Sequence, residues 1–331
     1  MKPRIPKTTV IALLALLGAA VLAGAPLIGM THVSLADILH PGDGDVFWRL
    51  RVPRVMMSFL AGMGLAVSGM AFQAMFRNPL ATPFTLGVSS GASLGAALYV
   101  LSGVQIAVLG FSGISVAAFA GALASILLVY GITRSRRGLS TGTMLLAGVA
   151  VSFFFSSVIL FVQYISDFAN TFRILRWIMG GMSIVGFEPL QQMLPFVLVG
   201  VGIVFFLRHE LNLMTTGEDI AASRGVNVKG TKQVLFFATS LMVGGVVAIC
   251  GPIGFVGMMS PHICRMFIGP DHRYLAPATL LFGGIFLTLC DVLARTVIAP
   301  AEIPVGVITA LLGGPFFLWL LIGASNERGI M

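Results

Sequence analysis

The chain has 331 residues, of which 57% are hydrophobic and only 10% charged, and its mean hydropathy is +0.99. Water-soluble domains carry about a quarter charged residues, so this composition excludes a soluble enzyme and indicates a protein whose solvent is the lipid bilayer. The net charge of +8 comes from 20 Lys and Arg that mostly stand singly between apolar runs, which makes no basic patch of the kind that binds nucleic acid.

Apolar runs bounded by charge, proline or glycine recur along the whole chain. A spanning helix needs about 20 apolar residues and satisfies its own backbone hydrogen bonds, so each run is a candidate helix. The run at 256–268 is too short to cross about 30 Å of hydrocarbon, and we expect a partial or protein-buried helix there. We predict one all-α polytopic membrane domain over 1–331 with about ten spans, at 8–30, 55–76, 86–108, 112–133, 142–166, 189–207, 233–250, 256–268, 275–298 and 305–324.

The distribution of Lys and Arg predicts which loops face the cytoplasm. If both termini are cytoplasmic, most basic residues fall in internal loops, as the positive-inside rule expects. The first run has an alternative interpretation, because basic residues at 2–7, an apolar stretch and small residues at 23–25 are also typical of a cleavable signal peptide. The basic residues placed outside are Arg49, Arg51, Arg54, Arg173, Arg176 and Arg295.

Arginines on the outer side work against this bias and require an anionic neighbour. Arg51 and Arg54 flank Pro53 at the start of the second span, where a proline suits the first helical turn. Arg295 follows Asp291 by four residues, a spacing that permits an ion pair within one helix. Two interpretations stay open: contact with lipid phosphates together with that ion pair, or a docking surface for an acidic soluble partner, because guanidinium groups bind carboxylates through two parallel hydrogen bonds.

The largest internal loop, residues 208–232, carries the signals of a short helix. Thr216 can act as N-cap, two acidic residues follow in the first turn, and Gly225 suits the C-cap. We predict a capped helix on the cytoplasmic face, with two small alanines that let another protein approach closely; a plain amphipathic surface helix is the alternative. The residues of this predicted contact surface are Thr216, Gly217, Glu218, Asp219, Ala221, Ala222 and Gly225.

Motifs that would carry chemistry are missing from the sequence. Residues 225–232 resemble a phosphate loop only superficially, because Thr231 stands where the motif needs lysine. The three cysteines lie in or beside apolar runs without metal-ligand spacing and are interpreted as buried thiols. We therefore expect a non-enzymatic chain with no bound cofactor or metal, and any ATP hydrolysis by another chain. An ion-coupled secondary transporter is the alternative, although it would show carboxylates near mid-span, for which Asp291 is the only candidate.

Several stretches between about residues 50 and 321 together resemble the permease subunits of bacterial ABC importers for iron-siderophores, haem and cobalamin. The combination, rather than any one motif, carries the resemblance. The stretches are RVPR (51–54), FRNPLA (76–81), LGVSSGA (86–92), LAGVA (146–150), RWIMGG (176–181), the loop 211–228, GPIGFVG (251–257) with Pro261-His262, GPDHR (269–273), DVLAR (291–295), and PVG (304–306) through GGPFF (313–317).

The resemblance implies a fold, a mechanism and a set of partners. Such permeases have the type II ABC importer architecture, pair as homodimers or with a homologous permease in the inner membrane, and move cargo between the two subunits by alternating access. Two cytoplasmic ATPase subunits hold ATP and Mg, and a soluble periplasmic or lipid-anchored binding protein delivers the cargo. The expected cargo is an iron chelate, with haem or cobalamin as alternatives. Arg51, Arg54 and Arg295 are expected to dock the binding protein, and the helix within 208–232 to couple to the ATPase.

Overall fold

The computed structural model describes residues 6–29, 46–108, 110–135, 141–182 and 184–328. These residues are almost entirely helical, and two very short strands pair antiparallel, Ala107 with Ser112 and Val108 with Phe111. In chain order the elements are α1 (Lys7–Gly24), η1 (Ala25–Leu27), η2 (Phe47–Arg51), α3 (Val52–Phe76), η3 (Pro83–Leu86), α4 (Val88–Ser102), β1 (Ala107–Val108), β2 (Phe111–Ser112), α5 (Gly113–Ser135), α6 (Thr141–Ile165), α7 (Phe168–Ile178), α8 (Glu188–Phe206), α9 (Arg208–Thr216), α10 (Glu218–Ser223), α11 (Val228–Cys250), α12 (Val256–Ile268), α13 (His272–Thr296) and α14 (Val305–Arg328).

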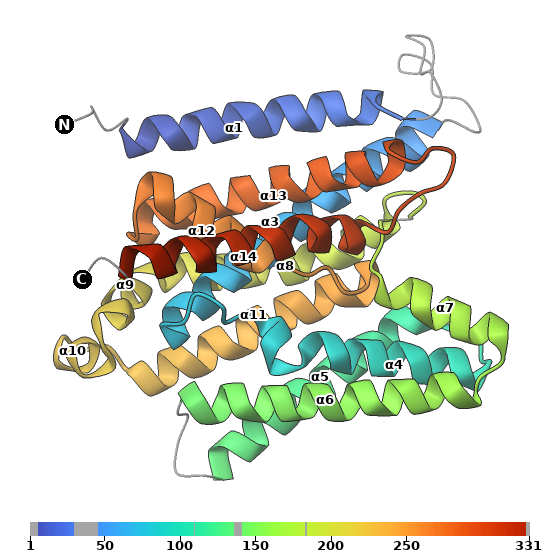
Figure 1. Cartoon of the computed structure of the whole chain (residues 1–331), viewed down its shortest axis with the longest axis horizontal. Helices are drawn as coiled ribbons and strands as arrows, with labels where there is room; N and C mark the ends of the chain where they lie inside the picture. Colours follow the sequence, from blue (N-terminus) through green and yellow to red (C-terminus); the bar gives the residue numbers. More distant parts are fainter. Residues whose placement is uncertain (1–5, 30–45, 109, 136–140, 183, 329–331) are drawn as a thin grey trace.

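The long helices run side by side as one bundle, with α1 along one edge and α6 near the opposite edge (Figure 1). Helix α3 is the central element, because it packs against α8, α11, α12 and α13 and nearly all of its side chains are buried. The start of α1 and the end of α14 lie at the same end of the bundle as α9 and α10, and α7 lies at the other end (Figure 1). The bundle therefore has two distinct ends, with different short helices on each.

Glycines set how closely α3 approaches its neighbours. A Cβ atom on Gly62 would overlap the backbone carbonyl of Gly283 in α13, and one on Gly69 would overlap the carbonyl of Gly257 in α12. Without side chains at these positions the helix backbones touch directly, which is how helices associate tightly in lipid, where no hydrophobic effect drives them together. These contacts bury the middle of α3 and hold its first turn in place for the site described below.

The ten predicted apolar runs all contain a helix, and α12, at 13 residues, is as short as predicted. In the described part of the chain, seven helices are long and apolar enough to cross a membrane, and α4 and the Val305–Leu320 part of α14 are shorter apolar helices. The count of ten spans, the cytoplasmic termini and the single-domain organisation stay predictions. Residues 1–5 and 30, which belong to the interpretation of the first run, lie outside the described residues.

Two helices were not predicted from the sequence. Helix α7 lies in the loop between the fifth and sixth predicted spans, and its N-cap Asp167 accepts a hydrogen bond from the backbone N–H of Asn170. Helix α9 directly follows α8 and fills the first part of the internal loop. Both are short and carry several polar residues, so a search for long apolar runs passes over them. The interpretation of the cysteines is confirmed, because Cys250, Cys264 and Cys290 are free and buried.

Candidate functional site

An ion-pair cluster joins three elements at the end of the bundle where α3 begins. Pro53 is in the first turn of α3, as predicted, and the next residue, Arg54, points at two carboxylates. Its Nε lies 3.0 and 3.1 Å from the two carboxylate oxygens of Asp291 in α13, and its Nη1 lies 3.0 Å from both oxygens of Glu302. One guanidinium therefore holds the end of α13 and the 297–304 loop against α3, using the paired geometry that suits arginine and carboxylate.

The predicted pair between Asp291 and Arg295 is present but is not the main contact of that carboxylate. Arg295 Nε lies 3.7 Å from Asp291 Oδ2, which is longer than any of the Arg54 contacts. Asp291 is fully buried, so it needs a compensating charge close by. Arg54 supplies it from 237 positions away in the chain, a distance that no local spacing rule could reveal.

The other two predicted docking arginines turn inward and bind η1, which directly follows α1. Arg51 Nη1 donates to the carbonyls of Pro26 and Leu27 at 3.2 and 3.4 Å, and Arg295 Nη2 donates to the carbonyl of Ala25 at 2.7 Å. All three carbonyls belong to η1, and a cation is favourable at the carboxyl end of a helix. Arg51 is 5% and Arg295 4% exposed, so in this structure their surfaces face the protein. Docking of a binding protein by these arginines stays a prediction.

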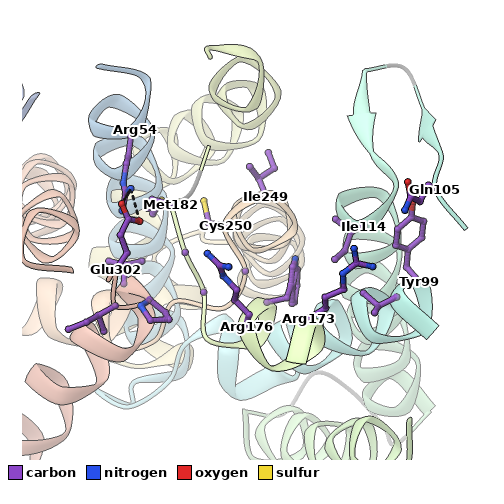
Figure 2. A pocket seen from close by; sticks show the side chains of 18 of the residues that line it. Arg54, Tyr99, Gln105, Ile114, Arg173, Arg176, Met182, Ile249, Cys250 and Glu302 are labelled. Carbon is purple, nitrogen blue, oxygen red and sulfur yellow. Dashed lines mark hydrogen bonds and ion pairs between the residues drawn. The ribbon is translucent and has the colours of Figure 1, made fainter. Parts of the chain in front are cut away.

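Beside this cluster lies a cavity of about 480 Å³ between α4, α5, α7, α11 and the segment leading into α14. Arg173 and Arg176 project into it from α7, and Arg54 and Glu302 stand on another side (Figure 2). The spacing of three residues places both α7 arginines on one face of that helix. Both side chains are exposed, and among the described residues neither has a hydrogen-bond or ion-pair partner. The cavity wall thus presents two unpaired cations.

Glycine-containing motifs that are far apart in the sequence meet at this cavity. Gly180 and Gly251 both have φ of +68°, a conformation that glycine adopts without strain, and a Cβ on Gly180 would overlap the carbonyl of Pro252. The N–H of Gly181 donates to the carbonyl of Cys250 at 2.8 Å, so the turn after α7 is bonded to the end of α11. These turns bring the carboxyl ends of α7 and α11 to the same cavity.

At the opposite end of the bundle, the predicted short helix exists but begins differently. Helix α10 has Gly217 as its N-cap, and the prediction of Thr216 as N-cap is wrong. Thr216 is instead the last residue of α9, and its hydroxyl donates to the carbonyl of Leu213 at 2.8 Å. The C-cap is Arg224 rather than the predicted Gly225, which follows it with φ of +87° and donates its N–H to the carbonyl of Ala222 at 3.0 Å.

Helix α10 is fixed to the rest of the chain by one ion pair and one buried side chain. Glu218 Oε1 lies 2.7 Å from Nζ of Lys232 in α11, and Lys232 is only 4% exposed. Ala221 is completely buried within this chain, so it is not part of any surface that a partner would meet. The exposed side of α10 consists of Asp219, Ile220, Ala222 and Ser223.

Comparison with known proteins identifies the family. Residues 8–323 match the model of the FecCD transport family, which is nearly the whole chain. The chain belongs to the FecCD transport family. It is 34% identical to the haemin transport system permease protein HmuU of Yersinia pestis over 99% of both chains, and 40% identical to the vitamin B12 import system permease protein BtuC of Salmonella paratyphi A over 87% of this chain and 89% of that one.

A solved structure of a metal-chelate type ABC transporter in an inward-facing conformation is 30% identical to this FecCD chain. It superposes with a TM-score of 0.84 over 96% of this chain and 99% of the other. The predicted type II ABC importer permease fold is therefore confirmed for the FecCD chain, which is a membrane transport subunit. The sequence predicts that Arg173 and Arg176 lie on the outer side, but only the fold brings them to the cavity.

Proposed function

We propose that this FecCD permease imports an iron chelate across the bacterial inner membrane, driven by ATP that is hydrolysed on separate cytoplasmic ATPase subunits. The observation that carries the proposal is the pairing of two features at opposite ends of one bundle. The cavity with the unpaired Arg173 and Arg176 suits entry of an anionic cargo, and α10 presents an exposed surface suited to an ATPase.

The relatives support a metal complex as cargo. HmuU is named for haemin, BtuC for vitamin B12, and the solved relative for a metal chelate. Many ferric chelates carry negative charge through deprotonated oxygens, and arginine is well suited to such groups. By this reasoning the two cavity arginines favour an iron chelate or haem over an uncharged cargo.

The environment of Asp291 argues against an ion-coupled carrier. A carboxylate that takes up and releases a coupling ion has to be accessible and to change its charge during the cycle. Asp291 is fully buried and clamped by Arg54, with Arg295 also close. Its charge serves to hold α3 and α13 together, so we assign the driving force to an ATPase partner.

The test is transport by purified components in liposomes. The permease is reconstituted as the assembled dimer with its ATPase and binding protein, and ATP-dependent accumulation of ferric siderophores, haem and cobalamin is measured. We expect accumulation of a ferric siderophore that requires ATP and both partners. Accumulation of haem or cobalamin alone would correct the cargo, and accumulation without ATP would overturn the mechanism in favour of an ion-coupled carrier.

A further inference from the structure

A second cavity lies on the flank of the bundle, away from the cluster at the outer end. It has a volume of about 700 Å³ and is formed by α8, α11 and the last turns of α5. Its lining is apolar except at one end, where Tyr130 and Gln233 stand. The apolar stretch along α11 runs from Val234 to Met242, roughly 12 Å at 1.5 Å per residue. A groove of this length and composition fits part of a hydrocarbon chain.

The polar end of the groove is made by one hydrogen bond between α5 and α11. The side-chain amide of Gln233 donates to the hydroxyl of Tyr130 at 3.0 Å. Since the hydroxyl acts as acceptor in this bond, its own hydrogen can be donated to a further acceptor, such as an ester or phosphate oxygen. The groove thus has an apolar body and a hydrogen-bonding end.

Two cations stand one helical turn beyond that end. Arg134 follows Tyr130 by four residues on α5, and Lys229 precedes Gln233 by four residues on α11. Residues four apart share a helix face, and α5 and α11 run in opposite directions, so the hydrogen bond between Tyr130 and Gln233 aligns both cations on the same side. Both side chains are exposed, and neither has a hydrogen-bond or ion-pair partner among the described residues.

We propose that this groove binds an anionic phospholipid, with one acyl chain along α8 and α11, the ester region at Tyr130 and Gln233, and the phosphate at Arg134 and Lys229. Basic sites between membrane helices at the cytoplasmic level bind anionic lipid head groups in this way. The charged end of the groove is the end that carries α9 and α10 (Figure 1). The site is separate from the cargo cavity, so the proposal stands whatever cargo the permease carries.

The order of chemical groups along the groove favours a lipid over another occupant. A second protein subunit would cover the apolar body without needing two unpaired cations at one end only. A free phosphate would use the cations and leave the apolar length empty. An anionic phospholipid matches all three parts in their order along the groove: its acyl chain fits the apolar body, its ester the hydrogen-bonding end, and its phosphate the two cations.

The experiment is native mass spectrometry of the delipidated permease titrated with dioleoylphosphatidylglycerol or dioleoylphosphatidylcholine. The two lipids have the same acyl chains and differ in head-group charge. We expect preferential binding of dioleoylphosphatidylglycerol. Its affinity should fall about 30-fold in the double variant Arg134→Gln/Lys229→Gln, because each basic residue near the membrane surface contributes about 1 kcal/mol to the binding of an anionic lipid. A second variant, Val199→Trp, fills the groove from α8 and should lower binding of both lipids.

Matched controls separate this site from general effects of charge and bulk. Arg77→Gln/Arg273→Gln removes two exposed cations that do not line the groove, and Leu198→Trp places the same side chain at an exposed neighbouring position outside it. Both controls should bind lipid like the parent. The proposal would be overturned if the parent bound the two lipids equally, or if the control double variant lost as much affinity as Arg134→Gln/Lys229→Gln. It would also be overturned if Val199→Trp changed the number of subunits without losing lipid.

Discussion

Asp291 sits fully buried between arginines of two helices, and its charge is balanced rather than exposed. Removing one partner of a buried pair is far more costly than the pair itself is stabilising, because the remaining charge stays desolvated. Reversing Arg54 to glutamate would place a third carboxylate beside Asp291 and Glu302. Such a variant would perturb the fold, so loss of transport in it would say little about docking of a binding protein.

The first prediction compares the two carboxylates that Arg54 holds. Asp291→Asn leaves Arg54 and Arg295 without their buried counter-charge and should destabilise the purified permease by about 3–5 kcal/mol. Glu302→Gln is the control, because the Glu302 side chain is 36% exposed and its pair should be worth about 1 kcal/mol or less. Thermal unfolding in detergent measures both, and equal losses in the two variants would refute the account of the cluster.

The second prediction concerns the arginines of α7. Arg173→Ala/Arg176→Ala should raise the cargo concentration needed for half-maximal uptake by at least about tenfold, because each hydrogen bond to a charged group contributes about 1.5–3 kcal/mol and about 1.4 kcal/mol is a tenfold change in affinity. The maximal rate should change little, and Lys at both positions should restore part of the loss. Arg49→Ala, an exposed arginine on the predicted outer side that does not line the cavity, is the control. An unchanged concentration dependence would remove these arginines from cargo binding.

At the scale of elements, the long helices follow from the sequence and the short helices α7 and α9 do not. The long apolar runs predicted every long helix, since period and length are visible locally. Helix α7 was missed because its residues 168–178 mix two arginines and an asparagine with apolar positions, although Asp167 is a recognisable N-cap. Thr216 was assigned to the wrong end of a helix because α9 continues directly from α8, so the cap signal at 216 competes with a helix already in progress.

The exposed side of α10 gives the third prediction. Ala222→Arg adds a bulky cation on that side and should abolish stimulation of the partner ATPase by the permease, with the assembled bundle intact. Thr215→Arg, an exposed position on α9, should leave stimulation near the parental level. The measurement is ATPase activity of the reconstituted complex with and without cargo-loaded binding protein. Parental stimulation in Ala222→Arg would place the ATPase contact elsewhere.

The junction of α9 and α13 gives a prediction on pH. The backbone N–H of Arg273 and the side-chain amide of Asn212 donate to Asp271 at 3.0 and 2.9 Å, and they lower the pKa of this carboxyl below its usual value. A depressed pKa in the folded state adds stability above the unfolded value, near pH 4, that is lost as the pH falls through the folded value.

We therefore expect the melting temperature of the permease to fall on acidification below about pH 4 partly through Asp271. Asp271→Asn keeps a side-chain oxygen for the N-cap but cannot titrate, so its melting temperature should be less dependent on pH in that range. Asp219→Asn, an exposed acid on α10, is the control and should follow the parent. Identical curves for all three proteins would contradict the assignment.

At the scale of the whole molecule, the direct backbone contacts of α3 with α12 and α13 set how closely these helices pack. A Cβ on Gly69 would overlap the backbone of Gly257, which cannot move aside as a flexible side chain could. Gly69→Ala should therefore lower the stability of the permease by about 1–3 kcal/mol. Gly202→Ala, where no atom lies within 4 Å of the added carbon, should be neutral or slightly stabilising. Thermal unfolding compares them, and equal stability of both variants would refute the packing argument.

The cavity and the ion-pair cluster could not be predicted from the sequence, although their residues could. Arg54, Arg173 and Arg176 stood out individually as cations on the predicted outer side. Their neighbours depend on how α3, α7, α11 and α13 pack, and packing depends on contacts between residues far apart in the chain. The position of Asp291 opposite Arg54 is one such contact.

Helix α11 connects the two ends of the molecule as one continuous helix. Its second turn carries Lys232, paired with Glu218 of α10, and its last residue, Cys250, lines the cavity. At 1.5 Å per residue its 23 residues extend about 34 Å, and no proline interrupts them. We therefore expect a displacement of α10 to tilt α11 as a rigid body and so to change the shape of the cavity at its other end.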